Sequence, residues 1–158
     1  MSDLARLRET FAGAGRLDWI GLRPERKAGL EAVRSGRVGP AGLEGDHARS
    51  GKRAVTLIQA EHLPVIAALA GLEAVEPETL RRNLVISGIN LTALREHGLR
   101  IGEVVLRITA PCAPCSRMEV ALGRGGYNAM RGHGGWCAEV VAPGEIVVGD
   151  VVTADLHP

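Results

Sequence analysis

The stretch Glu103-Val104-Val105-Leu106-Arg107-Ile108-Thr109-Ala110-Pro111-Cys112-Ala113-Pro114-Cys115-Ser116-Arg117 changes character halfway along. Its first seven residues are rich in valine, leucine and isoleucine, and they predict a β-strand over residues 103–109. Cys112 and Cys115 then follow between prolines, which restrict the backbone. The stretch therefore predicts a strand that ends in a stiff loop carrying two thiols.

Similar patterns predict further strands over residues 16–22, 53–58, 83–88, 136–141 and 146–154. Apolar spacing predicts short helices over 4–11, 61–72 and 77–82, and another directly after Cys115. We expect a long loop after residue 22, where three basic residues are followed by turn-forming ones: Arg23, Arg26, Lys27, Gly36, Gly39, Pro40, Gly42 and Gly45. The fold class is therefore mostly β with short helices (α+β), a small barrel or bent antiparallel sheet.

The length of 158 residues fits one domain with a sizeable core. Hydrophobic residues make up 46% and aromatics 3%, so Val, Ile, Leu and Ala must build that core. A net charge of +1 gives no sign of a nucleic-acid partner. Neither a membrane-length apolar run of roughly 18 residues nor a secretory pattern is present, so we expect a cytoplasmic protein without membrane attachment.

Three cysteines allow three interpretations, because an odd number in such a chain argues against a disulfide framework. A thioredoxin-like pair of Cys112 and Cys115 requires a long helix in a βαβ unit, which is not predicted. A zinc site could use the pattern C-x2-C-x17-H-x3-C formed by these two with His133 and Cys137. The third interpretation is a single functional thiolate at Cys115, favoured by the charge of Arg117, that binds a soft or high-valent metal.

The glycine-rich stretch 123–135 is either a mobile surface loop or a place where the backbone approaches a ligand closely. His47 and His133 can shuttle protons, although lone surface histidines are commoner. Asp46 and Asp150 each follow a glycine, and we interpret both as turn or cap residues.

Taken in order, six segments resemble those of a MOSC domain, the module named after the C-terminus of molybdenum-cofactor sulfurase. The resemblance covers residues 16–154 approximately and indicates one MOSC-like domain over residues 1–158. The segments are Gly42-Leu43-Glu44-Gly45-Asp46-His47, Arg53-Ala54-Val55-Thr56-Leu57-Ile58, Arg81-Arg82-Asn83-Leu84-Val85-Ile86-Ser87-Gly88, Ile101-Gly102, Pro111-Cys112-Ala113-Pro114-Cys115 and Gly144-Glu145-Ile146-Val147-Val148-Gly149-Asp150.

This resemblance implies a small β-barrel that binds the molybdenum cofactor, a pterin with a dithiolene and a terminal phosphate. Cys115 stands where family members have the cysteine that ligates molybdenum. Arg81 and Asn83 match an Arg-x-Asn motif that contacts the cofactor, and Arg53 and Lys27 are further, less specific matches. Arginine suits a phosphate because its forked donors meet two oxygens at once.

The implied reaction is the reduction of N-hydroxylated compounds. The sequence carries no flavin fingerprint or cysteine set for an iron–sulfur cluster, so electrons would come from a separate donor protein. One alternative is a sulfur carrier, in which a desulfurase places a persulfide on Cys115. Another is a zinc-stabilised module without enzymatic activity.

Overall fold

The computed structural model describes residues 2–26, 28–47 and 51–158. Its strands build an eight-stranded sheet in the order β11-β7-β8-β9-β5-β6-β1-β2, and pairing of β1 with β11 closes the sheet into a barrel. The strands are β1 Gly15–Leu22, β2 Glu31–Val33, β3 Ser35–Gly39, β4 Gly42–Leu43, β5 Val55–Gln59, β6 Leu84–Ser87, β7 Gly98–Ile101, β8 Val104–Pro111, β9 Trp136–Ala142, β10 Gly144–Val147 and β11 Val151–Asp155. The predicted fold class, a small α+β barrel, is confirmed.

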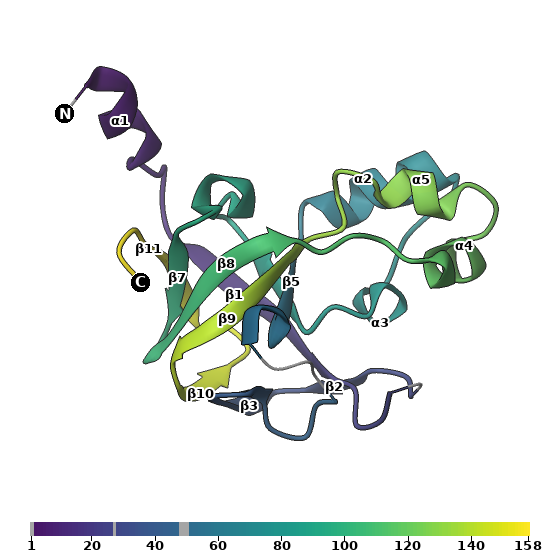
Figure 1. Cartoon of the computed structure of the whole chain (residues 1–158). Coiled ribbons are helices and arrows are strands. Elements are labelled where there is room, and N and C mark those ends of the chain that lie inside the picture. The colour runs from purple at the N-terminus through teal and green to yellow at the C-terminus, as the bar shows by residue number, and fades with distance from the viewer. Residues whose placement is uncertain (1, 27, 48–50) are drawn as a thin grey trace.

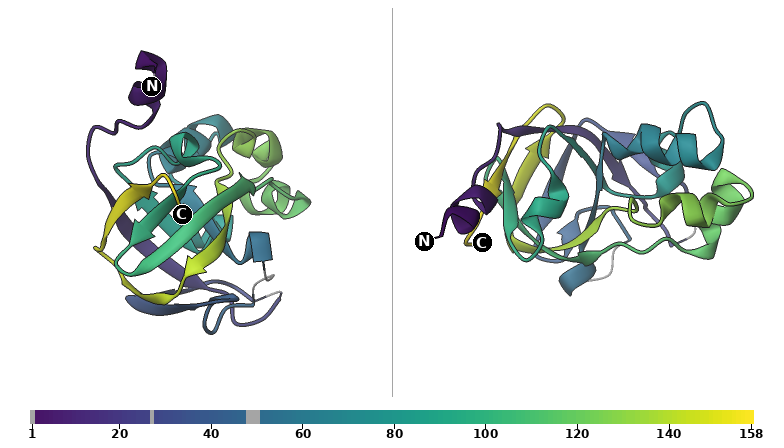
Figure 2. Two further views of the ribbon diagram at one scale, coloured as in Figure 1. Left: turned by 60° about the vertical axis from the view of Figure 1, so that its left-hand side comes forward. Right: turned by 90° about the horizontal axis from the view of Figure 1, so that it is seen from above.

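The helices are α1 Asp3–Arg8, α2 His62–Ala70, α3 Pro77–Leu80, α4 Ser116–Leu122 and α5 Gly126–Met130, with 3-10 turns η1 Gly51–Arg53 and η2 Leu91–Leu94. Helices α2, α3, α4 and α5 gather at one end of this barrel, whereas α1 lies with the N-terminus away from them (Figure 1). Seen from above, the two termini lie at the opposite end (Figure 2). No helix within the described ranges is long and apolar enough to span a membrane.

Strands β5 and β6 separate two hydrophobic cores. They pair in parallel, and successive side chains of a strand point to opposite faces. Leu57 therefore faces the barrel interior, whereas Ile58 faces a second core beneath the helices that also holds Ile66, Leu80 and Met118. Burial on both faces explains why apolar residues follow one another at Leu57-Ile58 in β5 and at Leu84-Val85-Ile86 in β6.

Three sequence predictions about the fold are wrong. The expected long loop contains β2, β3 and β4, and β3 pairs with β4 and β10 in a separate sheet. Glycine in β3 lets the Leu43 side chain pack closely, since a Cβ at Gly36 would lie 3.3 Å from it. The strand expected over 146–154 is two strands in different sheets, divided by the turn where Asp150 accepts from the Val147 backbone N–H. The glycine-rich stretch 123–135 contains α5 rather than only a loop.

Candidate functional site

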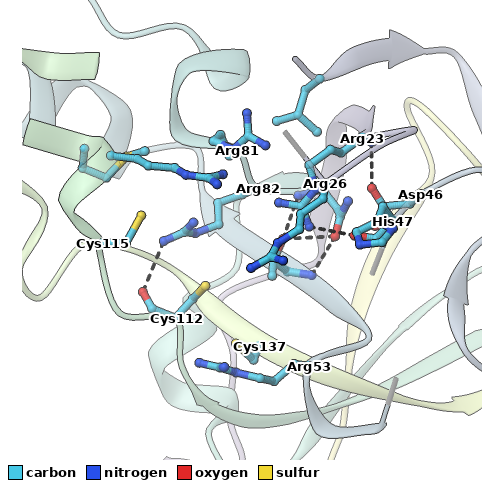
Figure 3. Close-up of a pocket in the computed structure, with 15 residues that line it drawn as sticks. Arg23, Arg26, Asp46, His47, Arg53, Arg81, Arg82, Cys112, Cys115 and Cys137 are labelled. Atoms are coloured by element: carbon cyan, nitrogen blue, oxygen red, sulfur yellow. Dashed lines mark hydrogen bonds between the residues drawn. The ribbon is translucent and has the colours of Figure 1, made fainter. Parts of the chain in front are cut away.

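A pocket of about 390 Å³ lies between the end of the barrel and the helices (Figure 3). Segments that are far apart in sequence meet there, including the ends of β1 and β8 and the connections that precede β5 and β6. Its size is that of small-molecule and cofactor sites in proteins. The pocket is lined by Arg23, Arg26, Leu30, Asp46, His47, Arg53, Thr56, Arg81, Arg82, Asn83, Cys112, Cys115, Arg117, Met118 and Cys137.

The loop after β8 places its two cysteines at different depths of this pocket. The Cys112 backbone N–H donates to the Gly135 carbonyl at 2.8 Å, which extends the β8–β9 pairing by one residue beyond Pro111. Cys112 is half-buried in the wall. Cys115 is exposed and is the N-cap residue of α4. The loop therefore holds one thiol in the wall and presents the other at the rim.

The third cysteine, Cys137, is buried in β9 next to Cys112. Hydrogen bonding with the Cys112 thiol, together with the positive charge of Arg53, lowers the pKa of Cys137 despite its burial. The same thiol–thiol hydrogen bond and burial raise the pKa of Cys112. Cys112 and Cys137 are therefore neighbouring thiols in the pocket wall, set beside the positive charge of Arg53.

Arg82 stabilises the pocket wall by hydrogen bonds to the backbone. Its buried guanidinium donates to three backbone carbonyls: Gly134 at 2.7 Å, Leu80 at 3.1 Å and Cys112 at 3.3 Å. Hydrogen bonds from a charged donor are stronger than those between neutral groups. Arg82 thus ties the cysteine loop to α3 and to the glycines before β9, and each of its three nitrogens donates to a backbone carbonyl.

Arg81, the preceding residue, has unused donors instead. Its φ of 61° lies in the left-handed region, which is uncommon for a residue with a side chain. Its Nη2 is buried and has no hydrogen-bond partner among the described residues. Burial, followed by repulsion from Arg23 and Arg117, lowers the pKa of Arg81. Such a group is stabilised by any anion that enters the pocket.

Asp46 and His47 hold the opposite wall. The Asp46 carboxylate accepts from the Arg23 backbone N–H at 2.7 Å, and the His47 carbonyl accepts from the Arg23 guanidinium at 2.8 Å. The turn role predicted for Asp150 is confirmed, since its carboxylate accepts from the Val147 N–H, whereas the Asp46 side chain bonds to a distant segment and does not cap its own turn. Arg23 Nε is buried without a partner among the described residues, which gives the pocket a second unused donor.

Asn83 joins three strands at the base of the pocket. Its Oδ1 accepts from the Thr56 backbone N–H at 3.1 Å and from the Thr56 hydroxyl at 3.0 Å, and its Nδ2 donates to the Gly21 carbonyl at 3.1 Å. Both lone pairs of Oδ1 are therefore used, and one N–H remains for a ligand. The contacts within the protein make Asn83 first of all a positioning residue.

Four of the five predicted site residues come together in this pocket: Cys115, Arg81, Asn83 and Arg53. The fifth, Lys27, lies outside the described residues. Sequence reasoning missed Arg82 and gave Arg23, Arg26 and Arg117 no place in the cofactor site. The signal was available in the strong excess of arginine over lysine and in the Arg81-Arg82 pair.

The zinc pattern is not assembled. His133 packs its ring against His62, with the ring centroids 5.2 Å apart, and it is not among the pocket residues. Within residues 2–26, 28–47 and 51–158, no group of three or more His, Cys, Asp and Glu side chains is placed to hold a metal ion. The zinc interpretation of Cys112, Cys115, His133 and Cys137 is therefore wrong.

Six arginines against one carboxylate make the described pocket lining strongly positive. Two of its arginines, Arg23 and Arg81, each carry a buried donor without a partner among the described residues, and the exposed Cys115 thiol also belongs to the lining. Guanidinium groups meet phosphate oxygens in pairs, and thiolate is a soft metal ligand. The donor set thus fits an anionic group that carries a thiophilic metal.

The closed barrel and its positively charged end pocket define a small single-barrel domain. A model described as "MOSC domain" matches residues 44–153, so the chain belongs to the MOSC domain family. This family is associated with binding of the molybdenum cofactor.

Solved structures share the fold. The YUAD protein from Bacillus subtilis has a TM-score of 0.80 and 16% identity, covering 92% of this chain and 98% of that one. YiiM from Escherichia coli has a TM-score of 0.69 and 21% identity over 88% of this chain and 69% of that one. YiiM from Geobacillus stearothermophilus has a TM-score of 0.74 and 15% identity over 89% and 74%. None of the curated proteins matches the chain significantly.

Proposed function

We propose that the pocket binds the molybdenum cofactor and that the domain reduces N-hydroxylated compounds with electrons from outside the chain. Membership of the MOSC family and the chemistry of the pocket support this proposal. Cys115 would ligate the metal. Arg81, Arg23 and Arg53 would bind the anionic parts of the cofactor, and Asn83 would keep the base of the pocket in place.

The observation that carries the proposal is the pair of buried, unpartnered guanidinium atoms. Arg81 Nη2 and Arg23 Nε have no acceptor among the described residues, although buried donors in proteins are nearly always satisfied. They line the same pocket as the exposed Cys115. An anionic ligand would satisfy both donors while its metal reached the thiol.

The bound group would supply the two-electron chemistry that breaks the N–O bond. The chain's own residues would orient the substrate, exclude bulk water and provide protons. His47 lines the pocket and is held by its backbone, whose N–H donates to the Arg23 carbonyl. Its imidazole can deliver a proton to the departing oxygen. We place this activity in the cytoplasm, where thiols stay reduced.

A second candidate function is sulfur transfer, favoured by the exposure of Cys115. A desulfurase needs to reach the acceptor thiol, and the start of α4 presents that thiol at the surface. The charge of Arg81 and Arg117 nearby would stabilise an anionic persulfide. Incubation with a cysteine desulfurase and cysteine would then leave cyanide-releasable sulfur on Cys115.

The reductase proposal is tested with protein from a host that makes the molybdenum cofactor. Chemically reduced methyl viologen supplies electrons, and benzamidoxime is the substrate. We expect benzamidine as product and its loss in Cys115→Ala, with Arg37→Met, an exposed arginine that is not part of the pocket lining, as the matched control. Loaded protein that forms no benzamidine would contradict the reductase function and direct attention to sulfur transfer.

A further inference from the structure

Cys112 and Cys137 form a second thiol centre in the pocket, separate from the rim thiol. In the β8–β9 pairing Ala110 lies opposite Cys137, and the Cys112 N–H bonds to the Gly135 carbonyl. Side chains two residues apart on a strand share a face, so Cys112 and Cys137 are diagonal neighbours on one face. Both line the pocket, and Cys137 is 2% exposed.

Two arginines accompany these thiols. Arg53 lines the same pocket as Cys137 and its positive charge lowers the pKa of that thiol, and Arg82 donates to the Cys112 carbonyl at 3.3 Å. A positive charge beside one member of a thiol pair favours its thiolate, the form that attacks a disulfide or another electrophile. Ordinary packing of a buried cysteine needs neither a second thiol nor a guanidinium beside it.

We propose that Cys112 and Cys137 are a redox-active dithiol that supplies the two electrons consumed in the pocket. This inference rests on the proposed reductase function and deepens it, because it names the electron source next to the reacting group. A dithiol gives up two electrons and two protons when it becomes a disulfide. Reduction of an N–O bond to an amine and water consumes the same numbers.

The balanced reaction has one hydroxylamine, R–NH–OH, and the two thiols as reactants. The N–O bond breaks and the S–S bond between Cys112 and Cys137 forms. The two thiol hydrogens end on nitrogen and oxygen, which gives R–NH2 and water. A dithiol reductant of the thioredoxin class then returns the pair to the reduced state by thiol–disulfide exchange, and its own two thiols become a disulfide.

The backbone of Cys112 is held in place, because its N–H bonds to the Gly135 carbonyl and its carbonyl accepts from Arg82. The S–S bond would therefore form by rotation of the two cysteine side chains while β9 stays in the barrel. Cys115 is three residues further along, exposed at the rim, and is free to hold a metal in either redox state. The pair and the rim thiol thus have separate tasks.

The first test needs no cofactor. Cys115→Ser protein, which retains only Cys112 and Cys137, is equilibrated in buffers of reduced and oxidised dithiothreitol and analysed by intact-mass and peptide mass spectrometry. We expect a species lighter by two hydrogens and a peptide that links Cys112 to Cys137, fully reversible by excess reduced dithiothreitol. Two free thiols throughout, under conditions that oxidise a control dithiol protein, would overturn the proposal.

The second test is a single turnover of cofactor-loaded protein. The protein is reduced with dithiothreitol, freed of it without air, and mixed with benzamidoxime. We expect benzamidine and the Cys112–Cys137 disulfide in equal amounts. Benzamidine without the disulfide would overturn the relay and leave the reductase function standing, whereas a failure to form benzamidine even with reduced methyl viologen would refute the reductase function itself.

Two variants extend this test to steady turnover. Benzamidoxime reduction is measured with a dithiol reductant and, in parallel, with reduced methyl viologen. In Cys137→Ala, and separately in Cys112→Ser, the rate with the dithiol should fall at least about tenfold more than the rate with methyl viologen. A merely structural role would lower both rates equally, and that result would contradict the relay. The wild-type disulfide measurement stands whether or not either variant folds.

Discussion

The barrel interior and the pocket at its end are built from the same strands but differ in chemistry. Every member of the interior cluster is apolar, whereas the described pocket lining contains six arginines and three cysteines. Strand β5 serves both regions, because Leu57 points into the interior and Thr56 lines the pocket opposite Cys137. Because successive side chains of β5 point to opposite faces, one face of the strand packs in the barrel interior and the other contributes to the pocket.

The two regions also differ in whether their residues need specific hydrogen-bond partners, and in whether those partners are present. Interior residues such as Leu17 and Leu99 are fully buried and need no specific partner. In the pocket, Arg82 has three acceptors while Arg81 and Arg23 keep unused donors. We conclude that the interior stabilises the fold, whereas part of the pocket lowers its stability in the absence of a ligand.

The largest expected effect on stability comes from Gly135→Ala, which introduces a side chain where the pocket wall packs directly against β5. Gly135 has a φ of 88°, and a Cβ there would overlap the Leu57 carbonyl in β5. We expect a loss of more than about 4 kcal/mol in the free energy of unfolding, measured by urea denaturation. The matched control is Gly132→Ala, with a φ of 84° and open space around the Cβ, where only the backbone strain of about 1 kcal/mol applies.

Similar losses in the two glycine variants would contradict this assignment of close packing between β5 and the glycines that precede β9.

The interior alone is tested by Leu99→Ala, which removes a fully buried side chain in β7. We expect the free energy of unfolding to fall by about 3 kcal/mol, as for other buried leucines. Leu99 does not line the pocket, so the affinity of the folded protein for inorganic phosphate should be unchanged. A weaker phosphate affinity would mean that the two regions are coupled.

The boundary between the regions is tested by Asn83→Asp. The new carboxylate still accepts from Thr56, but its second oxygen faces the Gly21 carbonyl where Asn83 Nδ2 donated. We expect a loss of about 2 kcal/mol in unfolding free energy and weaker phosphate binding, since a buried acceptor loses its donor and a negative charge enters the pocket. Unchanged stability would contradict the role of Asn83 as a joint between strands.

Arg81→Met should have opposite effects on stability and binding. Removing a half-buried guanidinium that has an unpartnered Nη2 and is repelled by Arg23 and Arg117 should slightly raise the free energy of unfolding. The same change should weaken phosphate binding about tenfold, measured by calorimetry, because a charge-assisted hydrogen bond is lost. Arg37→Met, which removes an exposed arginine, is the control. Equal phosphate affinities in the two variants would contradict the account.

The smallest effect concerns pH and the helices around the pocket. Burial, with a contribution from the neighbouring His133, lowers the pKa of His62 below its ordinary value of 6.5. The unfolded chain therefore binds this proton more readily, so stability should fall as the pH drops through 6.5. In His62→Gln, stability measured across that range should fall less steeply. If His157→Gln, which replaces an exposed histidine, changed the pH dependence of the unfolding free energy by the same amount, the lowered pKa of His62 would not be its cause.

The barrel was largely predictable because its signals are local. Alternation and apolar runs mark β1, β5, β6, β8 and β9 directly. The sheet of β3, β4 and β10 was missed since its strands are short and glycine-rich, and only pairing between distant segments makes them strands.

The pocket was predictable only through the family resemblance. Cys115, Arg81 and Asn83 were named from motifs, but no spacing along the chain shows that Arg23 reaches the same cavity. The pairing of Cys112 with Cys137 depends on the β8–β9 register, which places residues far apart in sequence on one face. The tight anchoring of Arg82 likewise became visible only in three dimensions.

The most direct test of the central claim is the metal and pterin content of protein purified from a host that makes the molybdenum cofactor. Wild type, Cys115→Ala and Leu99→Ala are compared, the last as a destabilised variant with an intact pocket. The account predicts molybdenum and pterin near one-to-one in wild type and Leu99→Ala, and little or no molybdenum in Cys115→Ala. Wild-type protein without molybdenum, beside a fully loaded control protein, would contradict it.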